Sequence, residues 1–487
     1  MNMRVALVHY HLQHGGVTRI VCHQQKALSQ RGITSVALIG KPPAVREAGT
    51  FRVVPGLQYE AERPSVSPSE LAAQMRTEAR AALGGPPDLW HVHNHSLGKN
   101  LVLPLVLEHL IARGERILFH IHDFAEDGRP ANYRAMLAVM AAGCRRTLAA
   151  LLYPRGEHLH YAVLNHRDYR LIEEAGLAAD HLHLLHNPVE LGPVGPSAFK
   201  APADQPPLWL YPTRAIRRKN LGEFLLWSAL APAGTRFGTT SGPGNPANHL
   251  YYRRWRQLAR ELDLPIQFEL VAPGGPSFVE LLGRAKVAVT TSVAEGFGMA
   301  FLEPWSLGVP VFGRNLPEIM PPAGNGDLSQ PWTYDRLEVP LDWLGRARVE
   351  QAAREGLRHF LASYGRDPAK DDVFRVLAAW IREGRIDFGR LDEPLQETVL
   401  KRLVVDQAQS ALAQPVELST AANVRDSVAK NQALLQSRYS LARYGEALEA
   451  IYQRVAASEV GSVDHLDGEI LLDRFLAPER LSLLRVD

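Results

Sequence analysis

The chain has 487 residues, 46% of them hydrophobic, which is enough for two or three globular domains with large cores. The 54 Lys and Arg residues balance 52 Asp and Glu residues, so neither a nucleic acid nor an acidic membrane is the expected partner. Only two cysteines, Cys22 and Cys144, occur, which excludes a disulfide framework and fits a cytoplasmic location. No signal peptide or transmembrane segment is predicted, and no pattern indicates an oligomeric state.

The N-terminal segment predicts a strand–helix–strand unit. A strand over 4–10 leads through a diglycine turn into a helix that ends near Arg31, and a second strand follows over 34–39. Gly15 and Gly16 form that turn, but the full G-x-G-x-x-G pattern is missing, which disfavours a dinucleotide-dependent oxidoreductase. A simple tight turn and a ligand-facing turn both remain open.

Histidines alternate with other residues between positions 88 and 95. On a strand, His91, His93 and His95 would point to one face, which is a suitable geometry for zinc. The aspartate of the H-x-H-x-D pattern of metallo-hydrolases is missing, so we predict no metal site and no cofactor. The alternative reading is a strand end that opens into a cleft, with Ser96 capping the next helix.

A further strand, over 116–121, ends in His120-Ile-His122-Asp123. Ligands of parallel α/β sheets bind at the carboxyl ends of the strands, so His122 is a candidate active-site residue, with a structural histidine as the alternative. The rest of this half predicts helices over 132–152 and 167–175 and strands over 161–164 and 182–185. Six prolines between residues 188 and 207 then predict a stiff linker.

The second half begins with a strand over 208–211 and a strongly basic turn. Arg214, Arg217, Arg218 and Lys219 follow within eight residues of that strand. The cations could neutralise a diphosphate, and a solvated basic turn is the alternative. We expect a loop over 234–248 with at most a short strand, a helix over 250–262, a strand over 266–271 and a helix over 278–284.

An acidic, glycine-containing turn follows the strand at 287–290. It runs from Glu295 through Gly298 into a helix over 299–307, which Pro304 disfavours, and a strand over 309–312 comes next. Glycines let the backbone approach a ligand, and the helix start directs free N–H groups at it. Carboxylates such as Glu295 and Glu303 accept hydrogen bonds from sugar hydroxyls, although both could be ordinary surface residues.

Together these segments resemble the GT-B fold, retaining glycosyltransferases of family 4. The family signature is E-G-F-G-x-x-x-x-E followed by G-x-P-V. It is matched by Glu295, Gly296, Phe297, Gly298, Glu303, Gly308, Pro310 and Val311. His122-Asp123, Asn187-Pro188-Val189, Arg214 and Lys219 also match, although Thr213 stands where the family has glycine. The resemblance implies an α/β fold with two Rossmann-like parallel-sheet domains that face each other across a cleft.

The resemblance also implies roles for individual residues. His122 and Glu295 would be the catalytic residues that contact the reacting sugar, and Glu303 would hold the ribose hydroxyls. The donor-binding set would be Gly15, Gly16, Arg214, Lys219, Gly296, Phe297, Gly298, Met299, Ala300 and Glu303. On the acceptor side the candidates are Asp123, Asn94 and His95, and Lys99, Arg129 and Arg134 could hold an anionic acceptor.

Four segments are expected. Residues 1–190 would form the acceptor-side domain, 191–207 the proline-rich linker and 208–430 the nucleotide-sugar-binding domain. The second domain would contain a helical insertion over about 320–430, with helices over 341–364, 372–383 and 394–412 and no readable role. Residues 431–487 would supply C-terminal helices, and the apolar stripe of the helix over about 432–455 would pack back onto the first domain.

The predicted enzyme is a retaining, metal-independent hexosyltransferase that uses a nucleotide diphosphate sugar and an unidentified hydroxyl acceptor. A phosphorylase or a nucleotide-sugar epimerase on the same scaffold is the first alternative. Orthophosphate dependence would identify the phosphorylase, and isomerisation without an acceptor would identify the epimerase. The second alternative is a non-catalytic or metal-binding protein that uses the histidine-rich strand.

Overall fold

The computed structural model divides the chain into two compact units. The first comprises Met1–Pro188 and Arg438–Leu476, and the second comprises Val189–Ser437 and Ala477–Asp487. The structure describes residues 3–45, 47–59, 66–190, 206–272, 274–320, 328–329, 331–408, 412 and 421–486. Residues 191–205 of the predicted linker, and parts of the predicted insertion, lie outside the described residues.

The first unit is built on a parallel seven-stranded sheet with the order β3-β2-β1-β4-β5-β7-β8. Such a sheet is buried on both faces, and every residue of β4, β5 and β7 is buried. The strands are β1 (Arg4–Val8), β2 (Thr34–Ile39), β3 (Phe51–Val53), β4 (Leu89–His93), β5 (Ile117–Ile121), β7 (Leu159–Val163) and β8 (Leu182–Leu184). The helices are α1 (Gly16–Gln30), α2 (Pro68–Leu83), α3 (Leu103–Ile111), α4 (Pro130–Ala141), α5 (Arg145–Leu152), α6 (His166–Glu174), α15 (Leu441–Ala457) and α16 (Gly468–Phe475).

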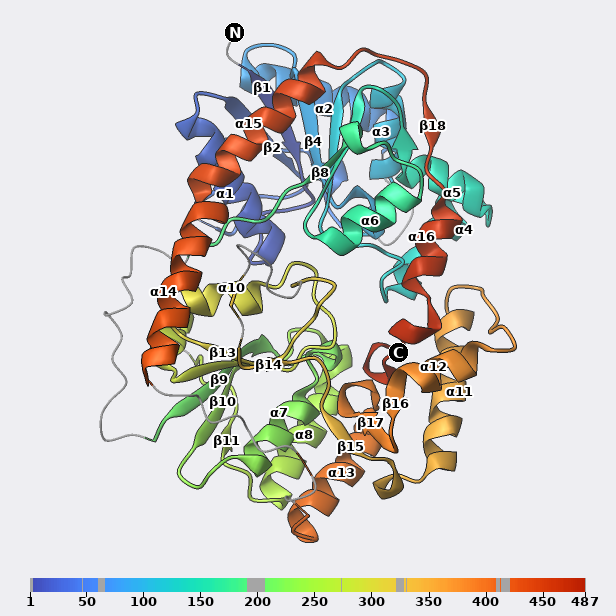
Figure 1. The fold of residues 1–487 in the computed structure, drawn as a ribbon. Helices are drawn as coiled ribbons and strands as arrows, with labels where there is room; N and C mark the ends of the chain where they lie inside the picture. Colours follow the sequence, from blue (N-terminus) through green and yellow to red (C-terminus); the bar gives the residue numbers. More distant parts are fainter. Residues whose placement is uncertain are drawn as a thin grey trace. The chain divides into compact units, whose positions relative to one another are not determined.

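Helix α15 returns from the far end of the chain and packs beside α1 (Figure 1). Its apolar residues join those of α1, β1 and β2 in one buried cluster, in which Leu448, Tyr452 and Val455 are fully buried. The predicted helix over 432–455 is two helices, α14 (Ala421–Arg438) and α15, because Ser440 is extended and caps α15 by accepting from the Arg443 N–H.

The second unit contains a parallel six-stranded sheet with the order β11-β10-β9-β12-β13-β14. Its strands are β9 (Leu208–Arg214), β10 (Arg236–Ser241), β11 (Ile266–Gln267), β12 (Val287–Thr290), β13 (Val311–Arg314) and β14 (Thr333–Tyr334). Its helices are α7 (Leu221–Leu230), α8 (His249–Glu261), α9 (Phe278–Arg284) and α10 (Met299–Ser306). Both units are therefore Rossmann-like.

The region expected to be a helical insertion also contains strands. β15 (Glu338–Pro340), β17 (Arg385–Asp387) and β16 (Ile381–Arg382) form an antiparallel sheet, and β14 extends the large parallel sheet. The helices of this region are α11 (Arg346–Ala362), α12 (Asp372–Trp380) and α13 (Glu393–Val405). Residues 477–486, expected with the C-terminal helices, group with the second unit, where the Trp380 indole N–H donates to the Leu481 carbonyl at 3.0 Å.

Two other expectations need correction. The predicted helix over 132–152 is broken between α4 and α5, where Ala142 has a φ of 46° and Gly143 a φ of 83°. Strand β11 stops at Gln267 instead of continuing to Val271. The helix predicted over 299–307 is confirmed as α10, although Pro304 lies inside it.

One membrane-related observation concerns α4 and α5. In the described ranges no single helix has the length and apolarity of a membrane span, and only the pair formed by these two helices, bent by 98°, meets that test jointly.

A buried arginine joins the large sheet of the second unit to the small one. The guanidinium of Arg314 donates to Glu223 at 2.6 Å and to Asp387 at 2.8 Å, and all three side chains are at most 5% exposed. Tyr334 donates to Glu223 at 2.6 Å. Two carboxylates thus share one guanidinium, the tyrosine hydroxyl supplies a further donor to Glu223, and Arg390 Nε lies 3.7 Å from Asp387 as a second cation, so each carboxylate faces a positive charge.

Replacing this arginine should destabilise the second unit. In Arg314→Leu the carboxylate of Glu223 would be buried without its cation and that of Asp387 would keep only Arg390 at 3.7 Å, so we expect a loss of about 3–5 kcal/mol in the free energy of unfolding. Arg346→Leu is the matched control, because Arg346 is exposed and pairs with Glu350 on the surface of α11; its loss should stay below about 0.5 kcal/mol. Equal thermal melting temperatures for the two variants would contradict this account.

Candidate functional site

In the second unit, the carboxylate of Glu295 lies between two cations of the basic turn. Lys219 Nζ donates to Glu295 Oε1, and Arg218 donates to Glu295 Oε2 at 3.2 Å. Arg218 also donates to the Ala294 carbonyl. The structure therefore brings together the predicted residues Glu295 and Lys219 and adds Arg218 to them.

Backbone geometry holds the basic turn in place. Asn220, with a φ of 51°, ends the short 3-10 helix Arg217–Lys219 and precedes α7. The hydroxyl groups of Tyr211 and Thr291 donate to the Lys219 carbonyl at 2.7 Å and 3.1 Å. Because these donors come from β9 and from the end of β12, the turn is fixed at the carboxyl edge of the sheet.

The local charges keep Glu295 ionised. Burial alone would raise the pKa of Glu295, but the charges of Lys219 and Arg218 outweigh it and lower the pKa to about 2. Only 9% of the Glu295 side chain is exposed, against 37% for Arg218. The Glu295 carboxylate is therefore largely shielded, while more than a third of the Arg218 side chain is exposed.

The glycine turn leads directly into helix α10. Gly298 has a φ of 92°, which favours glycine, and it is the residue before the first helical residue, Met299. A Cβ at Gly298 would lie 3.1 Å from the sulfur of Met320. Of the other predicted donor contacts, Phe297 and Glu303 are buried, Gly296 and Ala300 are half-buried, and Arg214 at the end of β9 is exposed.

In the first unit, His122 and Asp123 follow β5 and share one partner. The side-chain oxygen of Asn94 accepts from the backbone N–H of His122 at 2.7 Å and of Asp123 at 3.1 Å. Arg129 donates to the Asp123 carboxylate at 2.6 Å. Three predicted residues, Asn94, His122 and Asp123, are thus held together at the carboxyl end of β5.

His95 does not continue the alternation of His91 and His93. Strand β4 ends at His93, and His95 begins a short 3-10 helix. Its Nε2 bonds to the Leu152 carbonyl at 2.6 Å, and its ring packs on Phe119, whose side chain points to the opposite sheet face from that of His120. The expected row of three histidines on one face is therefore wrong.

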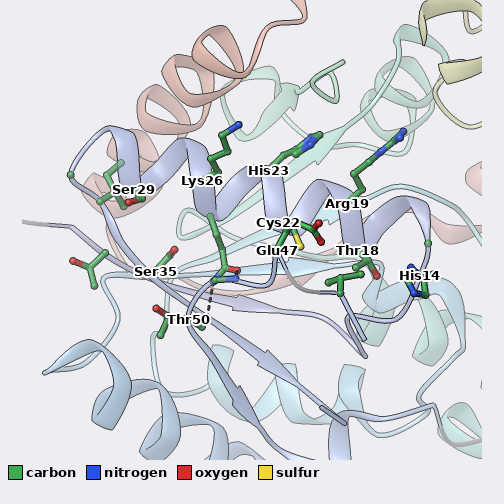
Figure 2. A pocket seen from close by; sticks show the side chains of 17 residues that line it. His14, Thr18, Arg19, Cys22, His23, Lys26, Ser29, Ser35, Glu47 and Thr50 are labelled. Carbon is green, nitrogen blue, oxygen red and sulfur yellow. Dashed lines mark hydrogen bonds between the residues drawn. The ribbon is translucent and has the colours of Figure 1, made fainter. Parts of the chain in front are cut away.

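Gly15 lies at the rim of a cavity of about 1020 Å³ beside α1, whereas Gly16 begins that helix. Figure 2 shows Arg19, His23 and Lys26 projecting from one side of α1. The cavity is also lined by Cys22 and by Glu47 of the loop after β2. It does not include His122, Asp123 or Asn94.

Sequence reasoning missed two sets of residues near the candidate site. Arg218 was noted only as part of a basic turn, although its position next to Lys219 was a signal. The contact between His122 and His93, and the contact between His93 and Gln24, are not predicted either. The paired H-x-H patterns at 91–93 and 120–122 place four imidazoles on one sheet face, since His93 and His120 are register partners.

Comparisons with known proteins show the fold. No family model matches the chain. A glycosyltransferase from Rickettsia africae ESF-5 matches with a TM-score of 0.55 and 14% identity over 94% of this chain and 100% of that chain. Anabaena Alr3699/HepE in complex with UDP matches with a TM-score of 0.52 and 12% identity over 92% and 99%. The chain thus has the fold of GT-B glycosyltransferases, as predicted.

A curated relative also matches in sequence. This chain is 24% identical over 331 residues to the mannosylglucosyl-3-phosphoglycerate synthase of Petrotoga mobilis. The matched region covers 61% of this chain and 62% of the length of that synthase.

Buried histidines of the first unit should make its stability sensitive to acid. Burial lowers the pKa to about 3 for His9, His91 and His160, and to about 4 for His95, His122 and His183. In the unfolded chain these groups titrate near 6.5, so their neutral form stabilises the fold fully above that pH. As the pH falls toward the folded-state values, the unfolded chain binds more protons, and each extra proton costs about 1.4 kcal/mol per pH unit.

Calorimetric melting between about pH 8 and pH 5 measures this effect, because most carboxylates stay ionised there; Glu126, whose pKa burial raises to about 7, acts in the opposite direction by at most one proton. The melting temperature should hold near pH 8 and fall below about pH 6.5. His160→Gln should flatten the fall, whereas exposed His109→Gln should not. A melting temperature that is constant across the range would show that the buried imidazoles are not neutral in the folded state.

Proposed function

We propose that this chain is a retaining glycosyltransferase of the family 4 type. It would move a hexosyl group from a nucleotide diphosphate sugar to an acceptor hydroxyl. The observation that carries the proposal is the Glu295–Lys219–Arg218 cluster, which lies at the carboxyl edge of a Rossmann-like sheet close in sequence to the glycine turn that begins α10. The UDP complex and the UDP-glucose complex of the structurally similar Anabaena protein support a nucleotide-sugar donor.

The chemistry of the donor side follows from these groups. Lys219, Arg218 and Arg214 would neutralise the leaving diphosphate, and the N–H groups at the start of α10 would add their partial positive charge. Charge on the leaving group is then compensated by protein cations, so we propose metal-independent transfer. Glu295 would accept hydrogen bonds from the transferred sugar, which requires the ionised form that its low pKa provides.

The acceptor is proposed to carry an anionic group. The Petrotoga synthase is named for a product that contains phosphoglycerate. Of the three basic residues considered for an anion, Arg129 is bonded to Asp123, Lys99 lies 5.8 Å from the centre of the Tyr59 ring, and Arg134 is exposed. Lys99 and Arg134 are therefore the basic residues that we assign to an anionic acceptor.

Nucleotide binding should depend on Lys219. Screening by thermal shift against UDP, GDP, ADP and their hexose conjugates should give a rise in melting temperature with one nucleotide family. Lys219→Ala removes a charge-assisted contact and should weaken that binding about ten- to a hundredfold. Lys286→Ala, at an exposed lysine of the same unit, should bind as the parent does. Equal nucleotide affinities for the parent, Lys219→Ala and Lys286→Ala would overturn the site assignment.

The stereochemistry tests the reaction type. With the donor found in that screen and a phosphorylated acceptor such as 3-phosphoglycerate or glucose 6-phosphate, NMR of the fresh product should show the anomeric configuration of the donor. A chelator should leave the rate unchanged. Inversion would overturn the retaining assignment, turnover only with orthophosphate would identify a phosphorylase, and isomerisation without an acceptor would identify an epimerase.

A further inference from the structure

His122 is the end of a buried chain of hydrogen bonds that runs across the first unit. Its Nε2 lies 2.9 Å from His93 Nδ1, and His93 Nε2 lies 2.9 Å from Gln24 Oε1. Gln24 and His93 are fully buried, and His122 is 5% exposed. Three different elements contribute: α1 supplies Gln24, β4 supplies His93, and the residue after β5 supplies the imidazole at the candidate site.

The direction of each bond follows from the donors and acceptors available. The amide oxygen of Gln24 only accepts, so His93 Nε2 carries the proton. In a neutral imidazole the other nitrogen then accepts, so His122 Nε2 must donate to His93 Nδ1. This leaves the lone pair on His122 Nδ1. Burial, which lowers the pKa of His93 well below its usual value, supports the neutral form.

A second branch starts from the Gln24 amide nitrogen. This nitrogen donates to the Tyr452 hydroxyl at 2.6 Å, and that hydroxyl lies 2.7 Å from His91 Nδ1. His91 Nε2 in turn lies 3.1 Å from His120 Nδ1. Tyr452 comes from α15, so a helix from the far end of the chain contacts the amide that joins both branches.

Metal binding is the competing use of these side chains, because one nitrogen each of His91, His93 and His120 lies within 4.8 Å of the others. The ring arrangement favours hydrogen bonding. The rings of His91 and His93 are stacked, with centroids 4.5 Å apart and planes 17° apart, and all four of their nitrogens have hydrogen-bond partners. A metal would need lone pairs that these bonds already use.

We propose that Gln24 and His93 are positioning residues that hold His122 as the Nε2–H tautomer, so that its Nδ1 accepts a hydrogen bond from a sugar hydroxyl. This rests on the proposed function. It also specifies the chemistry of the contact: a neutral imidazole that offers a lone pair recognises a hydroxyl donor and disfavours a phosphate or carboxylate oxygen.

Nitrogen-15 NMR of the full chain with ring-labelled histidine tests the tautomer without any substrate. His122→Asn identifies the His122 signals. In the parent protein at neutral pH we expect a protonated Nε2 and an unprotonated Nδ1. His93→Phe removes the acceptor and should give a mixture of tautomers. His93→Asn restores an acceptor near the Nδ1 position and should restore the single tautomer. His183→Asn, which breaks a separate buried imidazole pair of the same sheet, should leave His122 unchanged.

Addition of nucleotides and nucleotide sugars then separates the proposed glycosyltransferase function from the proposed positioning of His122. UDP-glucose or GDP-mannose should shift the Nδ1 signal of His122, whereas UDP or GDP alone should not. Failure of every nucleotide and nucleotide sugar to bind would overturn the proposed function and leave the tautomer result standing. The inference itself is overturned by an Nδ1–H or doubly protonated His122 in the parent, by an unchanged tautomer in His93→Phe, by a sugar nucleotide that binds without moving Nδ1, or by stoichiometric zinc in the purified protein.

Discussion

A parallel sheet must be covered on both faces, and in the first unit part of that cover comes from the far end of the chain. Helix α15 packs beside α1, so residues more than 400 positions apart share one buried cluster. Leu448 and Val455 supply apolar contacts, while Tyr452 supplies a hydroxyl that accepts from the Gln24 amide. The helix that completes the core therefore also completes the polar network that leads to His122, and the packing and the candidate chemistry of this unit depend on the same element.

In the second unit, a buried network of charged side chains joins two sheets. Arg314 at the end of β13 is buried between Glu223 of α7 and Asp387 of β17, so the small antiparallel sheet is joined to the large parallel one through compensated charges. Gly389 allows this arrangement, because a Cβ there would lie 2.5 Å from the guanidinium carbon of Arg314. Glu295, at the carboxyl edge of the same sheet, differs from the carboxylates of the Arg314 network because its two cationic partners, Lys219 and Arg218, remain partly exposed. The proposed diphosphate would compete with Glu295 for these two cations.

Local chemistry explains which parts of the structure the sequence could predict. Gly298 requires a left-handed conformation directly before α10, and the glycine turn predicted both that conformation and the start of the helix. The region over 234–248 is rich in glycine and predicts a loop with at most a short strand; β10 is that strand, and it lies between β9 and β11 in the sheet. Gly238 is there for space, since a Cβ would lie 2.4 Å from Leu270 Cδ1. The break after α4 has a local signal in Gly143, whose N–H donates to the Leu137 carbonyl at 2.9 Å, whereas the turn that removes His95 from β4 is held by the distant Leu152 carbonyl, which no local pattern records.

The candidate site likewise contains residues that the sequence could predict and residues that only the fold brings together. Glu295 and Lys219 could be found because short motifs carry them, and each motif corresponds to a loop at the end of a strand. His93, the partner of His122, lies in an H-x-H pattern, but the contributions of Gln24 and Tyr452 could not be predicted, because they meet the histidines only when α1 and α15 cover the same sheet face. Buried imidazoles in a core cost stability unless each is neutral and hydrogen-bonded. An apolar residue at His93 would avoid that cost but would leave His122 Nε2 without its acceptor, so the polar chain that ends at the carboxyl edge of the sheet is what the proposed orientation of His122 needs.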